Sequence, residues 1–129
     1  MMNLNTLIAV ASGGAIGATT RLYANDIINR YFGSNFPYGT MAVNLVGSLT
    51  IGLLMGYFMH HTHISPYIKT FLITGFLGGL TTYSTFAMES FFMLDSGRYI
   101  HALANISANL LGTIILAGAG YIIATNLIK

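Results

Sequence analysis

Long apolar stretches alternate with short polar segments along the chain. The apolar stretches cover residues 4–23, 38–58, 67–94 and 99–126. A helix needs about 20 mostly apolar residues to cross a bilayer. All tyrosines except Tyr83 lie near an end of a stretch or in a connection, as at membrane interfaces. The pattern predicts one domain, residues 1–129, made of four transmembrane helices.

The composition supports a membrane protein and excludes several other classes. Charged residues make up 6% and hydrophobic residues 54% of the chain, whereas soluble domains carry about 25% charged residues. There is no cluster of Lys and Arg, so nucleic acid is not an expected partner. Ala9-Val10-Ala11 resembles a signal cleavage site, but no Lys or Arg precedes it and the apolar run continues past it. We therefore expect an all-α, multi-pass protein surrounded by membrane lipid.

The positive charges are divided almost evenly between the two sides of the membrane. Lys69 and Lys129 lie on the side of the termini, whereas Arg30 and Arg98 lie on the other side, with Arg21 near that same end. Because an excess of Lys and Arg sets the orientation of a membrane protein, this near balance predicts that the chain inserts both ways. Polar groups inside so thin a bundle need protein or water around them. We expect an antiparallel homodimer with dual topology.

The third stretch contains an unusual run from Gly75 to Phe86. Three glycines and four Ser or Thr residues fall within these twelve positions. Gly and Thr are poorer helix formers than Ala or Leu, and the stretch is longer than one crossing needs. We predict a break between residues 78 and 82, near mid-membrane, where freed backbone groups could bind an ion. A continuous helix with packing glycines is the alternative.

Four side chains within the apolar stretches are candidates for chemistry. Asn44 offers two amide donors in the second stretch. Tyr83 and Phe86 lie one turn apart and present ring edges, which carry partial positive charge. Glu89 is the only acidic residue clearly inside a stretch. Helix packing and interhelical hydrogen bonds would also explain each of these residues taken singly.

Polar residues also occur in the first and fourth stretches. Arg21 lies toward the end of the first stretch, where it could attract anions into a vestibule. In the fourth stretch Asn105 and Asn109 share a helix face and Ser107 does not. Which of these three lines a pathway stays open.

Three segments together resemble the small fluoride channels of bacteria, the Fluc family. They are GGAIGA at 13–18 followed by Arg21, Asn44 within 39–48, and the run from Gly75 to Phe86, which is the most distinctive. The resemblance spans nearly the whole chain. The family usually has Phe at the position of Tyr83; because Tyr keeps the ring edge, we expect conduction to survive.

The resemblance implies passive export of cytoplasmic fluoride across the cell inner (plasma) membrane. It implies an antiparallel homodimer with two pores and a structural Na⁺ ion at its centre, held by the backbone carbonyls of Gly78 and Thr81. Arg21 would lie near a vestibule. The fluoride path would be lined by Asn44, Tyr83, Phe86, Ser84, Thr85 and Glu89.

Other functions fit the sequence less well. A small four-helix drug/proton antiporter needs an acidic residue deep in the first span, and none occurs before Asp26. A non-transporting assembly subunit would leave the concentration of Gly, Thr and aromatic residues in one span unexplained. No nucleophile–base pair or metal triad is visible at membrane depth, so we do not expect an enzyme.

Overall fold

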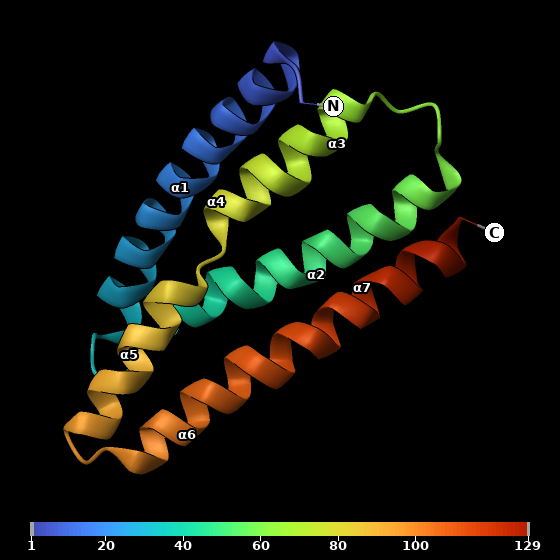
Figure 1. The fold of residues 1–129 in the computed structure, drawn as a ribbon. Coiled ribbons are helices and arrows are strands. Elements are labelled where there is room, and N and C mark those ends of the chain that lie inside the picture. The colour runs from blue at the N-terminus through green and yellow to red at the C-terminus, as the bar shows by residue number, and fades with distance from the viewer. Residues whose placement is uncertain (1, 129) are drawn as a thin grey trace.

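The computed structural model describes residues 2–128, and all regular structure in this part of the chain is helical (Figure 1). The first two helices are α1 (Leu4–Phe32) and α2 (Tyr38–His60). The third helical segment consists of α3 (Pro66–Thr70), the π-helical turn η1 (Phe71–Leu77), α4 (Gly78–Leu80) and α5 (Tyr83–Asp95). The fourth consists of α6 (Tyr99–Ser107), the π-helical turn η2 (Ala108–Gly112) and α7 (Thr113–Leu127).

The chain runs back and forth, so each helical segment is antiparallel to the one that follows it (Figure 1). α1 lies beside the first part of the third segment, and α2 lies beside α7. Side-chain hydrogen bonds join different helical segments at each end of the bundle. Asn3 Nδ2 donates to the Tyr67 hydroxyl at 3.3 Å, and the Arg98 guanidinium donates to the carbonyl of Asn35 at the opposite end.

Three helical segments within residues 2–128 are long and apolar enough to cross a membrane. They are Tyr38–His60, Pro66–Asp95 and Tyr99–Leu127, close to the stretches expected from the sequence. α1 has the length for a crossing but is not one of these three. A membrane crossing by α1, and the single domain of residues 1–129, stay predictions.

α1 is longer than the sequence pattern suggested. The first stretch was expected to end at residue 23 in a polar border, yet the helix continues to Phe32 and ends at Gly33, where φ is 83°. Asp26 and Arg30, one turn apart, form an ion pair at 2.8 Å on the helix surface. Polar residues at this spacing support a helix as well as a border, so the helix extends beyond the expected membrane span, whose end stays a prediction.

Glycines allow the helices to approach closely. A Cβ added at Gly75 would lie 3.0 Å from the Cα of Gly13 on α1. Likewise, a Cβ added at Gly120 of α7 would lie 2.9 Å from the backbone nitrogen of Leu53 on α2. Small residues at such contacts are how membrane helices gain packing energy without an aqueous driving force. A core of Val43, Leu77 and Leu80 then fills the space between α2 and the third segment.

Candidate functional site

The third helical segment is broken, as the sequence predicted. α4 ends at Leu80, and Thr81 and Thr82 are extended, with φ, ψ of −82°, 153° and −148°, 113°. α5 then begins at Tyr83, because Thr82 Oγ1 accepts the N–H of Thr85 at 3.3 Å and caps the new helix. The break is therefore made by two threonines, and the glycine pair before it remains helical.

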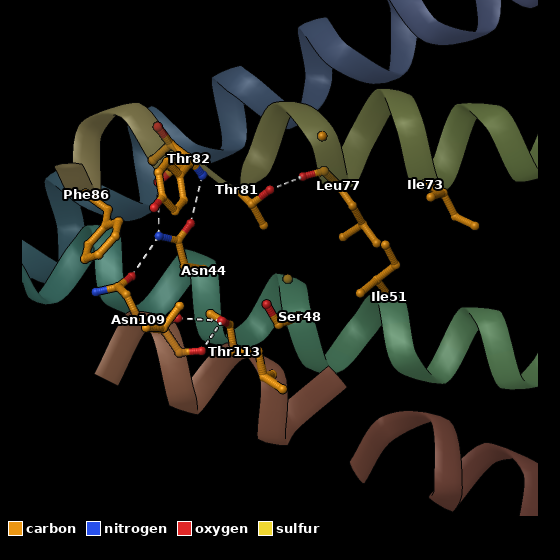
Figure 2. A pocket seen from close by; sticks show the side chains of 15 residues that line it. Asn44, Ser48, Ile51, Ile73, Leu77, Thr81, Thr82, Phe86, Asn109 and Thr113 are labelled. Carbon is orange, nitrogen blue, oxygen red and sulfur yellow. Dashed lines mark hydrogen bonds between the residues drawn. The ribbon is translucent and has the colours of Figure 1, made fainter. Parts of the chain in front are cut away.

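Asn44 on α2 supports the broken backbone from the side. The N–H of Thr82 donates to Asn44 Oδ1 at 2.8 Å, and Asn44 Nδ2 donates to the carbonyl of Thr82 at 3.1 Å (Figure 2). Thr82 is 6% exposed and Asn44 is 7% exposed. A break inside a membrane leaves backbone groups that must be satisfied within the protein. One side-chain amide satisfies two of them here.

The break releases several carbonyl groups from the helical pattern, among them those of Gly78 and Thr81. In a continuous helix the carbonyl of Gly78 would accept the N–H of Thr82, and that of Thr81 would accept the N–H of Thr85. Both N–H groups are instead bound by side chains, those of Asn44 and Thr82. The carbonyls of Gly78 and Thr81 are thus among the released groups, and they are the pair that the family resemblance assigned to Na⁺.

Carbonyl oxygens suit a hard cation, but one chain supplies only part of a coordination shell. The Arg21 guanidinium donates to the carbonyl of Thr81 at 3.3 Å, which places a positive charge beside that oxygen. The carbonyls of Gly78 and Thr81 are thus chemically suitable ligands for a hard cation, whereas the positive charge of Arg21 beside Thr81 would repel one. The role of Arg21 at a vestibule stays a prediction, since its observed contact is with the break.

A cavity of about 350 Å³ lies against the break, between α2, the third segment and the fourth segment. Its lining includes five of the residues expected from the sequence, which are Asn44, Gly78, Thr81, Tyr83 and Phe86. Figure 2 shows Asn44, Thr82 and Asn109 joined by hydrogen bonds along one side of the cavity. The wall is thus made of amides, hydroxyls, aromatic rings and aliphatic side chains.

Tyr83 and Phe86 form an edge-to-face aromatic pair at this cavity. Their ring centroids are 5.3 Å apart and their planes are inclined by 71°. Phe86 is 7% exposed, whereas Tyr83 is 76% exposed. An aromatic edge attracts an anion weakly and without a fixed charge. Both rings line the cavity, Phe86 as a buried side chain and Tyr83 as an exposed one.

Ser84 and Thr85 lie beside the break rather than in the cavity wall. Thr82 Oγ1 donates to Thr85 Oγ1 at 2.9 Å, and the Ser84 hydroxyl is 3.5 Å from Thr82 Oγ1. Both residues are exposed in the single chain, and neither belongs to the lining of the 350 Å³ cavity. Their place in a fluoride path stays a prediction.

Glu89 is remote from this cavity. It lines a second cavity of about 410 Å³, together with Arg98 and the connection at 34–37. Glu89 Oε1 accepts a hydrogen bond from the Thr40 hydroxyl at 2.8 Å, and Oε2 is buried with no partner within residues 2–128. The place of Glu89 in a fluoride path stays a prediction.

Sequence reasoning left undecided the polar residues of the fourth segment, and the structure distinguishes them. Asn109 lines the 350 Å³ cavity and accepts a hydrogen bond from Asn44 Nδ2 at 2.8 Å. Asn105 is fully buried. Ser107 is half-buried and does not line that cavity. The spacing of Asn105 and Asn109 was a signal for a shared polar face, but their partners were not visible in the sequence.

Comparison with known proteins gives a consistent result over nearly the whole chain. The model of the family described as "CrcB-like protein, Camphor Resistance (CrcB)" matches residues 8–121. A Sulfurimonas denitrificans protein named "Fluoride-specific ion channel FluC" is 52% identical over 95% of this chain and 95% of its own length. Proteins of the same name from Nautilia profundicola and Escherichia coli O1:K1 are 45% and 39% identical, over 93% and 96% of this chain and 94% and 98% of their own lengths.

The family match and the helical structure agree on the type of protein. Three apolar helical segments and relatives named as ion channels make this chain a multi-pass membrane protein. The resemblance seen in the sequence motifs is confirmed by the family match over residues 8–121. The chain belongs to the CrcB-like protein family.

Proposed function

We propose that this protein is a fluoride-specific ion channel that exports cytoplasmic fluoride passively across the cell inner membrane. The observation that carries the proposal is the 52% identity, over 95% of the chain, to a protein named as such a channel. A channel is not an enzyme, in keeping with the expectation from the sequence. The cavity at the break supports the assignment chemically.

The residues that line the cavity are polar or apolar but uncharged, and the hydroxyl of Ser48 lies among them as a donor. The donors of Asn44, Asn109 and Thr113 are bonded within the chain and hold the polar side of the wall in place. A small hydrated anion must exchange water for such donors, and weak contacts at several points allow it to leave again. A charged side chain in the wall would hold the ion more tightly. Neutral donors and ring edges therefore suit rapid passage.

The proposed channel is an antiparallel homodimer with two pores. Two features of the single chain support a second copy. Tyr83 is 76% exposed although it adjoins the break inside an apolar segment. In the fourth segment, Tyr99–Leu127, only 11% of the most apolar stretch is buried within the single chain. A polar hydroxyl in lipid is unfavourable, so protein or water should cover Tyr83.

We also propose a structural Na⁺ ion on the axis of that dimer. When bound, the ion would neutralise the partial negative charge of backbone carbonyls brought together from two copies. Gly78 and Thr81 of each chain would hold it, since both carbonyls are released from helical bonding by the contacts of Asn44 and Thr82. Hard cations prefer oxygen ligands of this kind.

The alternative, a small drug/proton antiporter, gains no support from the structure. Such a protein needs a carboxylate deep in the first helix. Asp26 lies near the end of α1, its side chain is 52% exposed, and it is paired with Arg30. Glu89 is half-buried, and it lies in α5.

Fluoride efflux from liposomes containing the purified protein tests the proposed function. We expect rapid fluoride release, followed with a fluoride-selective electrode, and no chloride release from matched chloride-loaded liposomes. Empty liposomes measure leakage. A well-folded protein that releases neither ion, or releases chloride equally well, would refute the assignment.

A further inference from the structure

The amide of Asn44 is itself held by a second asparagine. Its Oδ1 accepts the N–H of Thr82 at 2.8 Å, and its Nδ2 donates both to the carbonyl of Thr82 and to Asn109 Oδ1, at 3.1 and 2.8 Å. An amide nitrogen has two N–H groups, so both donors of Asn44 are used. In this arrangement Asn44 has no donor to spare for an anion.

The hydrogen bonds continue from Asn109 into α6 and return to α5. Asn109 Nδ2 donates to Oδ1 of Asn105 and to its backbone carbonyl, both at 3.0 Å. Asn105 Nδ2 donates to the hydroxyl of Ser90 at 3.0 Å, and that hydroxyl donates to the carbonyl of Phe86 at 2.8 Å. We refer to Asn44, Asn109 and Asn105 as the asparagine chain. It connects the break to the helical turn that carries Phe86.

The asparagine chain has one direction. Each amide oxygen accepts from the preceding group, and each amide nitrogen donates to the next. Consecutive hydrogen bonds of this kind polarise and strengthen one another. The direction is set at one end by the N–H of Thr82, since turning the Asn44 amide over would bring two donors together. At the other end it is set by the carbonyl of Phe86, which can only accept.

Asn105 stands apart from the cavity that we assign to fluoride. Its side chain has no exposed surface, and it does not belong to the lining of the 350 Å³ cavity. Ser90 and Asn109 are 6% and 5% exposed. A buried polar group that loses its partner carries the full desolvation penalty. Removal of Asn105 should therefore be felt by Asn109 and, through it, by Asn44.

We propose that Asn105 is a positioning residue, which acts through Asn109 to fix the Asn44 amide and, with it, the backbone of Thr82. This role concerns how the backbone of Thr82 is held at the break. The inference rests on the proposed function only in the experiment that measures fluoride flux. Asn105 touches neither the cavity nor the break, so its effect would be transmitted by oriented hydrogen bonds.

The test compares Asn105→Ala with Ser107→Ala in protein reconstituted in lipid nanodiscs. Residue-specific amide exchange by NMR measures the protection of the Thr82 N–H. We expect its exchange to quicken about fivefold to tenfold in Asn105→Ala, as befits one weakened hydrogen bond. The side-chain amide protons of Asn44, two links away, should move upfield. Ser107→Ala, in the same helix, should leave both signals unchanged.

Fluoride efflux from liposomes provides a separate readout for the same variants. We expect Asn105→Ala to slow fluoride efflux about tenfold and Ser107→Ala to leave it unchanged, if the protein is the channel proposed above. Should the wild type conduct no fluoride while Thr82 exchange still responds to Asn105, the positioning role stands and the proposed function fails. Should the wild type conduct fluoride while Asn105→Ala changes neither exchange nor flux, the positioning role is refuted and the function stands.

Ser90→Ala removes the acceptor of the hydrogen bond from Asn105 with the loss of a single oxygen atom. It is the decisive variant if Asn105→Ala does not fold. Both substitutions interrupt the same series of hydrogen bonds. The Thr82 N–H of the double variant should therefore exchange no faster than that of the faster single variant. Unchanged Thr82 exchange in folded Ser90→Ala, or simple addition of the two effects, would refute the proposal.

Discussion

The Thr40 hydroxyl donates a hydrogen bond to Glu89 Oε1 at 2.8 Å, which joins the first turn of α2 to the middle of α5. Thr40 is 2% exposed and Glu89 is half-buried, so the contact is partly shielded from water. The other carboxylate oxygen of Glu89 has no partner within residues 2–128. This single hydrogen bond is therefore the only one that the described residues give to the carboxylate.

Loss of this contact should destabilise the protein. Thr40→Val keeps the shape of the side chain and removes the donor, so both carboxylate oxygens of Glu89 would lack a partner. We expect the free energy of unfolding to fall by about 1–3 kcal/mol, measured by denaturation in detergent. Thr50→Val is the control, since the Thr50 hydroxyl bonds only to its own helix, at the carbonyl of Val46. Equal stability of the two variants would contradict the prediction.

Removal of the Asn44 amide should disable the pathway while the fold survives. Asn44→Ala leaves the N–H and carbonyl of Thr82 without their side-chain partner at the break. We expect fluoride efflux from liposomes to fall by about tenfold or more, since misplacement of pathway groups is costly. Asn126→Ala, an exposed asparagine near the end of α7, is the matched control. Efflux at the wild-type rate in Asn44→Ala would rule out this role.

The hydroxyl of Tyr83 should be dispensable, whereas its ring should not. Tyr83→Phe keeps the edge-to-face contact with Phe86, whose centroid distance is 5.3 Å. We expect fluoride efflux within about twofold of wild type for Tyr83→Phe and a large loss for Tyr83→Ala, because the ring edge supplies the partial positive charge. A loss of efflux in Tyr83→Phe as great as in Tyr83→Ala would show that the hydroxyl is needed.

The contact between α1 and the third segment should not tolerate a methyl group. A Cβ at Gly75 would lie 3.0–3.2 Å from backbone atoms of Gly13, Val10 and Ala9, none of which can rotate away. We expect Gly75→Ala to lower the free energy of unfolding by about 1–3 kcal/mol.

Gly118→Ala is the matched control for that substitution. A Cβ at Gly118 would meet nothing within 4 Å, and the residue lies inside α7. Alanine is the better helix former by about 1 kcal/mol, so this variant should be as stable as wild type or more stable. If Gly75→Ala proved equally harmless, the close approach of α1 would not be rigid.

Withdrawal of sodium tests the proposed ion at the dimer centre. Replacement of Na⁺ by the bulky cation N-methylglucamine throughout purification and assay should leave the released carbonyls of Gly78 and Thr81 without a ligand. We expect slower fluoride efflux that recovers when Na⁺ is restored. Identical efflux in the two buffers, with sodium verified absent, would speak against a structural Na⁺.

The sequence predicted features that depend on local composition. The three apolar segments from 38 onward lie close to their expected ranges, and the break falls at Thr81–Thr82, inside the expected interval. Asn44 was identified as a candidate because it offers amide donors inside an apolar stretch, and the structure shows its amide bound to the broken backbone. Hydropathy and helix propensity act over a few residues, so the sequence displays them directly.

Features that depend on tertiary contacts were predicted less well. Glu89 follows Phe86 by three residues, yet it lines a different cavity because Thr40 on α2 holds its carboxylate. Asn105 donates to the hydroxyl of Ser90 on α5, a contact that the sequence of α6 alone does not predict. The π-helical turns at 71–77 and 108–112 were not foreseen, because residue type alone does not mark them. Each of these depends on which helices become neighbours.

The two threonines of the break divide the third segment between two packing units. Before the break the segment lies against α1, and after it α5 lies against α6. Side chains therefore hold the backbone at Thr81 and Thr82, because the N–H of Thr82 is bound by Asn44 and not by the carbonyl of Gly78. A single side-chain amide, that of Asn44, therefore holds the backbone at the point where the third segment passes from one packing partner to the other.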